Sequence, residues 1–182
     1  MNGFQIVTEM KKDDKIFLVG FMGCGKSTFG RKIASALNWN FVDLDEYIEE
    51  NEGKSISRIF KELGETYFRD LETLTLKEIQ KWNKTIVSCG GGTPCFNNNA
   101  ELINNSGLSV YISLSPETLK DRLEGEKSKR PLIERLSNIE LLSFIQNKLS
   151  EREEFYNKAK IKFDYSDDKA ESFIDYLRSL VT

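Results

Sequence analysis

Residues 20–27 read GFMGCGKS, which fits the pattern GxxxxGK[ST]. The run lies directly after the apolar stretch KIFLVG at residues 15–20, a predicted strand, and directly before a predicted helix at residues 27–37. This strand–loop–helix context is the one that the pattern requires. Glycines let such a loop curl until successive N–H groups point at phosphate oxygens, and the helix N-terminus adds partial positive charge. The alternative, a glycine-rich turn with a chance lysine, is disfavoured by this context.

The loop therefore predicts a binding site for the phosphates of a nucleotide. Lys26 can reach the β- and γ-phosphates, and the Ser27 hydroxyl can ligate Mg²⁺. The candidate nucleotide-binding residues are Gly23, Cys24, Gly25, Lys26, Ser27 and Thr28. The motif leaves open what is done with the phosphate.

Short apolar runs alternate with helical stretches along the chain. Strands are predicted at residues 15–20, 40–44, 85–89, 108–114 and 161–165. Helices are predicted at residues 27–37, 46–50, 56–82 with a break near Gly64, from 116 onward after the N-cap Ser115, 138–160 and 169–180. Residues 1–14 are a polar extension, and residues 125–135 are a polar loop. This order predicts an α/β fold with a five-stranded, mainly parallel sheet flanked by helices.

Length and composition narrow the functional class. The 182 residues fit one domain, residues 1–182, and we find no break that would mark a second. The net charge of −3 disfavours a nucleic-acid partner, since such binders usually carry a basic surplus. The chain has no histidine, which excludes Ser-His-Asp and Cys-His nucleophilic sites and the histidine-containing zinc sites.

The cysteines and the apolar runs predict a cellular location. Cys24, Cys89 and Cys95 show no CxxC spacing, which is typical of free thiols in a reducing compartment. The first fifteen residues lack the apolar core of a signal peptide, and no apolar run reaches membrane-spanning length. A cytoplasmic protein without a membrane partner is expected.

Two acidic residues lie at the end of the second predicted strand. Asp43 and Asp45 lie two positions apart, and in extended geometry both would face the carboxyl edge of the sheet, where such folds bind ligands. One carboxylate can help to hold Mg²⁺ through water, and the other can accept a hydrogen bond from an attacking hydroxyl. The alternative is that these acids only cap the helix predicted at residues 46–50.

A glycine run and three arginines complete the candidate set. Gly90, Gly91 and Gly92 end the third strand, and their lack of side chains favours close approach of a ligand, although a flexible turn is the alternative. Arginine forks suit carboxylates and phosphates. Spacing alone does not distinguish Arg69, Arg130 and Arg152 from solvated surface charges.

Taken in order, these motifs resemble the shikimate kinase family. The runs GFMGCGKST, DLD, FRDLE, SCGGG, KRPL and EREEFY occur in that family's order, over roughly residues 15–180. The resemblance implies a three-layer P-loop kinase fold similar to nucleoside monophosphate kinases. It also implies a substrate-binding region at about residues 44–83 and a mobile lid at about residues 124–135. The implied reaction is Mg²⁺-dependent transfer of the ATP γ-phosphoryl group to the 3-hydroxyl of shikimate by a monomer.

The resemblance also implies roles for individual residues. Asp43 would belong with Ser27 to the metal site, and Asp45 would contact the shikimate hydroxyls. Arg69 and Arg152 would hold the shikimate carboxylate, together with the backbone of residues 90–92. Arg130 would reach the phosphates from the lid and act in catalysis with Lys26 and Asp45. Arg122 would lie near the adenine, and Glu72 would orient Arg69. The thiol of Cys24 would lie beside the phosphates.

Two other readings compete with this one. Gluconate-type and nucleoside monophosphate kinases share the phosphate loop, so the loop cannot separate them from a shikimate kinase. The glycine run and the two candidate carboxylate-binding arginines favour shikimate. A catalytically dead homologue, serving as a nucleotide sensor, would be expected to lose Lys26, Asp45 or the lid arginine, and the sequence keeps all three.

Overall fold

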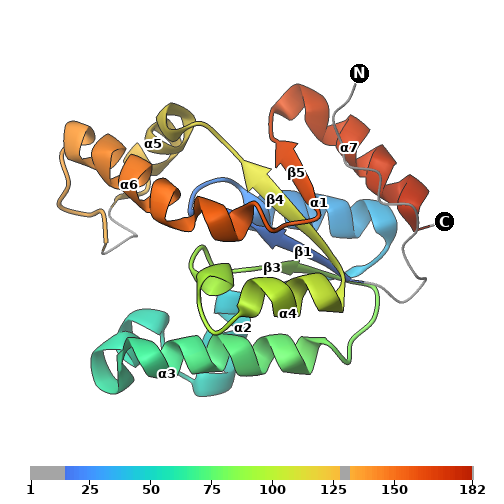
Figure 1. Ribbon diagram of the computed structural model, residues 1–182, viewed down its shortest axis with the longest axis horizontal. Helices are drawn as coiled ribbons and strands as arrows, with labels where there is room; N and C mark the ends of the chain where they lie inside the picture. The colour runs from blue at the N-terminus through green and yellow to red at the C-terminus, as the bar shows by residue number, and fades with distance from the viewer. Residues whose placement is uncertain (1–14, 128–131, 182) are drawn as a thin grey trace.

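The computed structural model of the protein describes residues 15–127 and 132–181. Its centre is one five-stranded sheet in the order β2-β3-β1-β4-β5, in which every paired neighbour runs parallel (Figure 1). The strands are β1 (Lys15–Val19), β2 (Asn40–Asp43), β3 (Thr85–Ser88), β4 (Leu108–Ser113) and β5 (Ile161–Asp164). The predicted α/β fold, with a parallel five-stranded sheet flanked by helices, is confirmed.

Helices connect and cover these strands. They are α1 (Lys26–Leu37), α2 (Leu44–Glu52), α3 (Ile56–Ile79), α4 (Asn99–Ser106), α5 (Pro116–Glu124), α6 (Asn138–Tyr156) and α7 (Asp167–Leu180), with a short 3₁₀ turn η1 (Thr93–Cys95). Helix α4 and η1 were not predicted from the sequence. The predicted N-terminal extension at residues 1–14 and the lid residue Arg130 lie outside the described residues.

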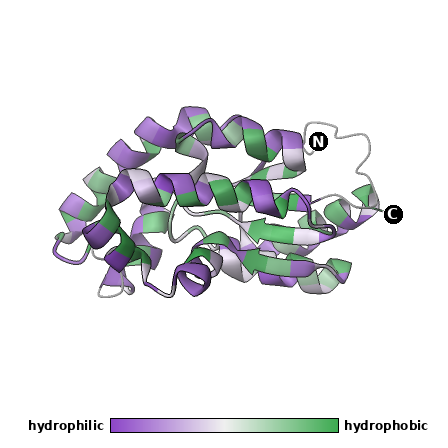
Figure 2. Ribbon diagram, turned by 90° about the horizontal axis from the view of Figure 1, so that it is seen from below, coloured by the Kyte–Doolittle hydropathy of each residue, from purple (hydrophilic) through white to green (hydrophobic). Residues whose placement is uncertain are grey.

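Both faces of the sheet are buried. Along β1, Ile16 and Leu18 point into a core with α1 and α7, whereas Phe17 and Val19 point into a second core with α2, α3 and α4. This alternation follows from the two-residue period of a strand. The central strands of a parallel sheet covered on both faces are apolar at nearly every position, which is why residues 16–19 of β1 form a continuous apolar run. In Figure 2 the strands are accordingly coloured as apolar and much of the helix surface as polar.

The strand register brings three chain segments to one edge. Ser88 pairs with Leu18 of β1 on one side and with Asp43 of β2 on the other. Because the three strands are parallel, the loop after β1, the start of α2 and the glycine run after β3 all begin at the same level. Open α/β sheets bind ligands at this carboxyl edge.

Helix α3 contains the predicted break at Gly64. This residue has φ 85° and ψ 169°, a conformation that a residue with a side chain rarely adopts. Helical geometry resumes at Glu65, and Phe60 and Phe68 pack across the break with ring centroids 4.9 Å apart. The break therefore divides α3 into two packed segments, and the second carries Arg69.

Candidate active site

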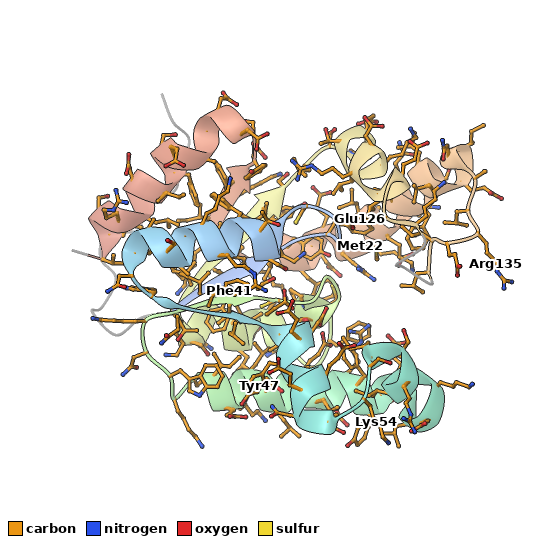
Figure 3. All side chains as sticks on the ribbon, turned by 180° about the vertical axis from the view of Figure 1, so that it is seen from behind. Met22, Phe41, Tyr47, Lys54, Glu126 and Arg135 are labelled. Atoms are coloured by element: carbon orange, nitrogen blue, oxygen red, sulfur yellow. The ribbon has the colours of Figure 1, made fainter. Side chains whose placement is uncertain are left out.

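A cleft of about 370 Å³ lies at the carboxyl edge of the sheet. Its walls come from the loop after β1, the start of α2, the end of β3 and the residues after α5. Figure 3 labels two of its residues, Met22 and Glu126, at the same end of the molecule. The lining residues are Met22, Gly23, Gly25, Lys26, Ser27, Thr28, Asp43, Asp45, Ser88, Cys89, Gly90, Gly91 and Glu126. Nine of the candidate residues predicted from the sequence thus share one cleft.

The loop between β1 and α1 is preformed. Gly25 has φ 95° and forms the N-cap of α1, so a residue with a side chain would be strained there. The Lys26 side chain is buried and folds back along the loop, where its Nζ donates to the carbonyl oxygens of Gly20 and Phe21, both at 2.9 Å. These bonds hold a positive charge at the helix N-terminus, where backbone N–H groups favour an anion.

The Cys24 thiol is buried behind the phosphate loop and does not line the cleft. The side chain is only 1% exposed and packs in the hydrophobic core with Phe29 and Leu123. Its backbone N–H donates to the carbonyl of Phe21 at 3.3 Å. The loop turns this side chain toward the core, and Lys26 Nζ lies 3.7 Å from its Sγ.

Ser27, Asp43 and Ser88 form a cluster of oxygen atoms at the base of the cleft. The Ser27 hydroxyl donates to Asp43 Oδ2 at 2.5 Å and lies 3.2 Å from the Ser88 hydroxyl. Mg²⁺ prefers hard oxygen ligands and is commonly held by one or two protein groups together with substrate phosphates and water. The cluster, next to a loop built for phosphates, fits that ion.

Asp45 lies in the cleft, but in a different backbone conformation from the one predicted from the sequence. The second strand ends at Asp43, whose side chain caps α2 by accepting from the Asp45 N–H at 3.1 Å. Asp45 therefore belongs to the first helical turn, and the expected extended geometry that would place both carboxylates on one strand face is wrong. Burial, followed by the neighbouring Asp43 and Glu72 carboxylates, raises the pKa of Asp45 to about 7. A carboxyl group in that range can exchange a proton near neutral pH.

Each glycine of the run 90–92 lies against another part of the site. A Cβ at Gly90 would lie 2.7 Å from Asp45 Oδ1, and a Cβ at Gly92 would lie 2.9 Å from Arg69 Nη1. A Cβ at Gly91 would lie 3.3 Å from the backbone nitrogen of Met22 in the phosphate loop. None of the three has a positive φ. The run is therefore made of glycine because functional side chains and the phosphate loop pack directly against its backbone.

Arg69 lies at one end of this run, held by two acids. Its Nη1 donates to Glu72 Oε2 at 2.8 Å, and its Nη2 donates to Glu65 Oε1 at 2.9 Å. Burial acts to lower the pKa of Arg69, but the two carboxylates outweigh it and the net pKa is raised. Glu72 is itself fully buried and also accepts from the Thr93 hydroxyl; burial raises its pKa despite Arg69. Arg69 is thus a fixed cation beside the cleft.

Arg152 approaches the same run from α6. Its Nη1 donates to the Gly91 carbonyl at 3.3 Å. Tyr156, one helical turn further along, is fully buried and donates to the same oxygen at 2.5 Å. One carbonyl therefore joins the glycine run to the helix that carries Arg152.

Arg122 lies next to the phosphate loop. Its Nη1 donates to the Cys24 carbonyl at 3.2 Å, and its guanidinium lies 5.4 Å from the centre of the Tyr165 ring. Arg122 thus lies between the phosphate loop and Tyr165, which directly follows β5. Arg130, predicted to act from the lid, lies outside the described residues.

Several residues of the site were not predicted from the sequence. Ser88, Glu126 and Cys89 line the cleft, and Glu65 and Tyr156 hold the two arginines. For the last two a signal existed, because Glu65 precedes Arg69 by four residues and Tyr156 follows Arg152 by four, the spacing of neighbours on a helix. Ser27 and Ser88 are 61 residues apart in sequence, so no local spacing pattern indicates that they are neighbours.

Comparison with known proteins places the chain among one group of enzymes. The family model described as shikimate kinase matches residues 22–181. A shikimate kinase from Parabacteroides distasonis is 45% identical over 150 residues, covering 82% of this chain and 87% of the relative. One from Phocaeicola vulgatus is 42% identical over 168 residues, covering 90% and 96%.

Solved structures agree with the sequence matches. The crystal structure of shikimate kinase from Bacteroides thetaiotaomicron superposes with a TM-score of 0.85 at 38% identity, covering 92% of this chain and 98% of that one. Shikimate kinase from Acinetobacter baumannii, solved in complex with shikimate, gives a TM-score of 0.80 at 30% identity and covers 92% of each chain.

Proposed function

The chain belongs to the shikimate kinase family, and we propose that its cleft transfers the γ-phosphoryl group of ATP to the 3-hydroxyl of shikimate, giving ADP and shikimate 3-phosphate. The glycine run is the observation that best supports this assignment of the site residues. The backbone of Gly91 lies against the phosphate loop, and the backbone of Gly92 lies against the Arg69 guanidinium. An anion-binding loop and a cation that can bind a carboxylate therefore contact the same short segment. A phosphoryl donor and an anionic acceptor can therefore bind within reach of each other.

The donor side of the proposal rests on the phosphate loop. The N–H groups of residues 23–28 and the Lys26 ammonium bind the β- and γ-phosphates of ATP. Lys26 exchanges its bonds to the Gly20 and Phe21 carbonyls for phosphate oxygens. Arg122, bonded to the Cys24 carbonyl, supports the loop on the adenine side. Because the transition state of phosphoryl transfer is loose, these fixed charges contribute most of the catalysis.

On the acceptor side, Arg69 and Arg152 bind the shikimate carboxylate next to the backbone of residues 90–92. Asp45, whose Oδ1 lies against Gly90, accepts a hydrogen bond from the 3-hydroxyl and aligns its oxygen with the γ-phosphorus. The raised pKa of Asp45 suits a group that takes a proton from the hydroxyl as the new P–O bond forms.

The metal of the proposal is Mg²⁺, which Ser27 and Asp43 would hold together with water. When bound there, it neutralises charge on the β- and γ-phosphates. Ser27 and Asp43 position their oxygens for it through their mutual hydrogen bond, and Ser88 lies beside them.

We also propose the wider setting of the enzyme. The chain acts as a single domain and a monomer, with a substrate-binding region at about residues 44–83 and a lid at about residues 124–135 that brings Arg130 onto the phosphates. The three cysteines are free thiols, which supports a reducing, cytoplasmic location. Within residues 15–127 and 132–181, no helix is long and apolar enough to cross a membrane.

The test is ADP release by the purified protein with Mg·ATP, with and without shikimate, next to gluconate, AMP and CMP. Turnover that depends on shikimate and stops with EDTA supports both substrate and metal. Stimulation by gluconate or a nucleoside monophosphate instead would assign the acceptor pocket to another substrate. ATP binding without turnover on any acceptor would favour a nucleotide sensor.

A further inference from the structure

The ion pair between Glu65 and Arg69 differs from an ordinary surface pair, because the arginine in it is largely buried. A single oxygen, Oε1, accepts from Arg69 Nε at 3.1 Å and from Nη2 at 2.9 Å. The Glu65 side chain is 56% exposed, whereas that of Arg69 is only 13% exposed. The Phe96 ring also covers the guanidinium, with its centre 4.1 Å from Cζ. The arginine is therefore enclosed, and Glu65 closes its solvent side.

The backbone of α3 is built to present Glu65 at this place. Gly64 has φ 85°, and a Cβ added there would meet nothing within 4 Å, so the glycine serves the backbone conformation and not close packing. The break makes Glu65 the first residue of the second helical segment, where partial positive charge favours a carboxylate. A glutamate four residues before an arginine is also the favourable order for a helical pair.

The bonds already made by Arg69 define what it can still bind. A guanidinium carries five N–H donors. Two donate to Glu65 and one to Glu72, which leaves one N–H on each terminal nitrogen. Such a pair is what a carboxylate uses in a bidentate contact.

We propose that Glu65 is a positioning residue for the acceptor site: by holding the Nε edge of Arg69, it turns the two remaining N–H groups toward the substrate carboxylate. This inference rests on the proposed binding of the shikimate carboxylate by Arg69. Glu65 acts through Arg69 and does not itself contact the substrate.

The same helix provides a matched control. Glu62 forms a pair with Arg58 at 2.6 Å, also four residues apart and exposed, but before the break at Gly64. An exposed pair of this kind contributes little to stability. Substituting Glu62 changes charge and helix pairing as substituting Glu65 does, without touching Arg69.

The experiment compares Glu65→Ala, Glu65→Gln and Glu62→Ala in steady-state kinetics, with shikimate varied at saturating Mg·ATP. We expect Glu65→Ala to raise the KM for shikimate roughly tenfold, with kcat and the KM for ATP within about twofold of wild type. Glu65→Gln keeps an oxygen that accepts from Arg69 and should recover part of the loss. Glu62→Ala should match wild type, and a thermal melt shows whether each variant is folded.

A neutral acceptor, the methyl ester of shikimate, gives a second readout. It lacks the carboxylate that Arg69 would bind, so Glu65→Ala should leave kcat/KM for the ester unchanged. An unchanged or lowered KM for shikimate in Glu65→Ala would overturn the inference, as would an equal loss on the ester. If wild-type protein does not turn over shikimate, the proposed function fails first, which is a distinct result.

Discussion

The Ser27 hydroxyl donates a 2.5 Å hydrogen bond to Asp43 Oδ2, across sixteen residues of sequence. The other oxygen of the same carboxylate, Oδ1, accepts from the Asp45 N–H and so caps α2. One carboxylate thus links the phosphate loop to the helix that carries Asp45. The helix cap is therefore observed, and the proposed metal-site role falls on the same side chain.

Substituting Asp43 should separate these two roles. Asparagine is a good N-cap but carries no charge, so Asp43→Asn should fold normally and need roughly tenfold more Mg²⁺ for half-maximal activity. Asp43→Ala should show the same need for Mg²⁺ and should also lose about 1 kcal/mol of unfolding free energy with the cap. Mg²⁺ titration of activity and denaturant unfolding measure the two effects. An unchanged Mg²⁺ curve in Asp43→Asn would remove Asp43 from the metal site.

Gly92 should tolerate no side chain. Alanine at this position places its Cβ 2.9–3.2 Å from the Arg69 guanidinium, which must then shift from its bonds to Glu65 and Glu72. We expect Gly92→Ala to raise the KM for shikimate at least roughly tenfold while ATP binding stays near wild type.

Gly125, at the start of the proposed lid, offers a steric control for Gly92. It has φ −74°, and an added Cβ would meet nothing within 4 Å, so Gly125→Ala should leave the KM for shikimate near the wild-type value. If Gly92→Ala also behaves like wild type, the close packing of Arg69 on the glycine run does not matter for the acceptor.

We expect the Tyr156 hydroxyl to affect shikimate binding through its contacts with Gly91 and Arg152. Tyr156→Phe removes the hydrogen bonds of the hydroxyl to the Gly91 carbonyl and to Arg152, and it leaves a buried ring against Tyr111. Losing a buried hydrogen bond costs about 1 kcal/mol. We expect a KM for shikimate raised about three- to tenfold, since the carbonyl that positions Arg152 is less firmly held. Tyr47→Phe, which loses an exposed bond to Glu78, is the control. Equal effects in the two variants would point to general destabilisation.

Sequence patterns predicted the parts of this molecule that are governed by local rules. The strand at residues 15–19 is apolar at each position except Lys15, and the loop after it has fixed glycine positions, so both could be placed at once. Helix α4 could not. Asn97 and Asn98 adopt positive φ before it, and its stability comes from burying Ala100 and Ile103 against the sheet, which is a tertiary effect.

The same limit explains the error at Asp45 and the unpredicted burial of the Cys24 thiol. Asp45 was expected on a strand, but the Asp43 cap starts the helix one residue after the strand ends, and a cap is a contact that periodicity does not reveal. The direction of the Cys24 side chain depends on positive φ at Gly23 and Gly25 on either side. A residue type in a motif therefore predicts the backbone better than it predicts where the side chain points.

Thiol labelling should distinguish the core from the cleft. Cys24 and Cys89 are each 1% exposed, whereas Cys95 is half-buried near Arg152, Arg69, Glu72 and Glu154. Burial raises the pKa of Cys95 to about 11, although the two arginines oppose it. Because the thiolate is the reactive form, iodoacetamide should modify Cys95 slowly at pH 8, and the rate should rise about tenfold per pH unit up to about pH 11.

In the native protein, mass spectrometry should find label on Cys95 alone, and Cys95→Ser should abolish native-state labelling. Unfolding in guanidinium chloride should expose all three thiols, which is the positive control. Label on Cys24 of the folded protein would show that the phosphate loop opens enough to turn its thiol toward solvent. In that case bound Mg·ATP, which closes the loop on phosphate, should slow the reaction at Cys24 and leave Cys95 unaffected.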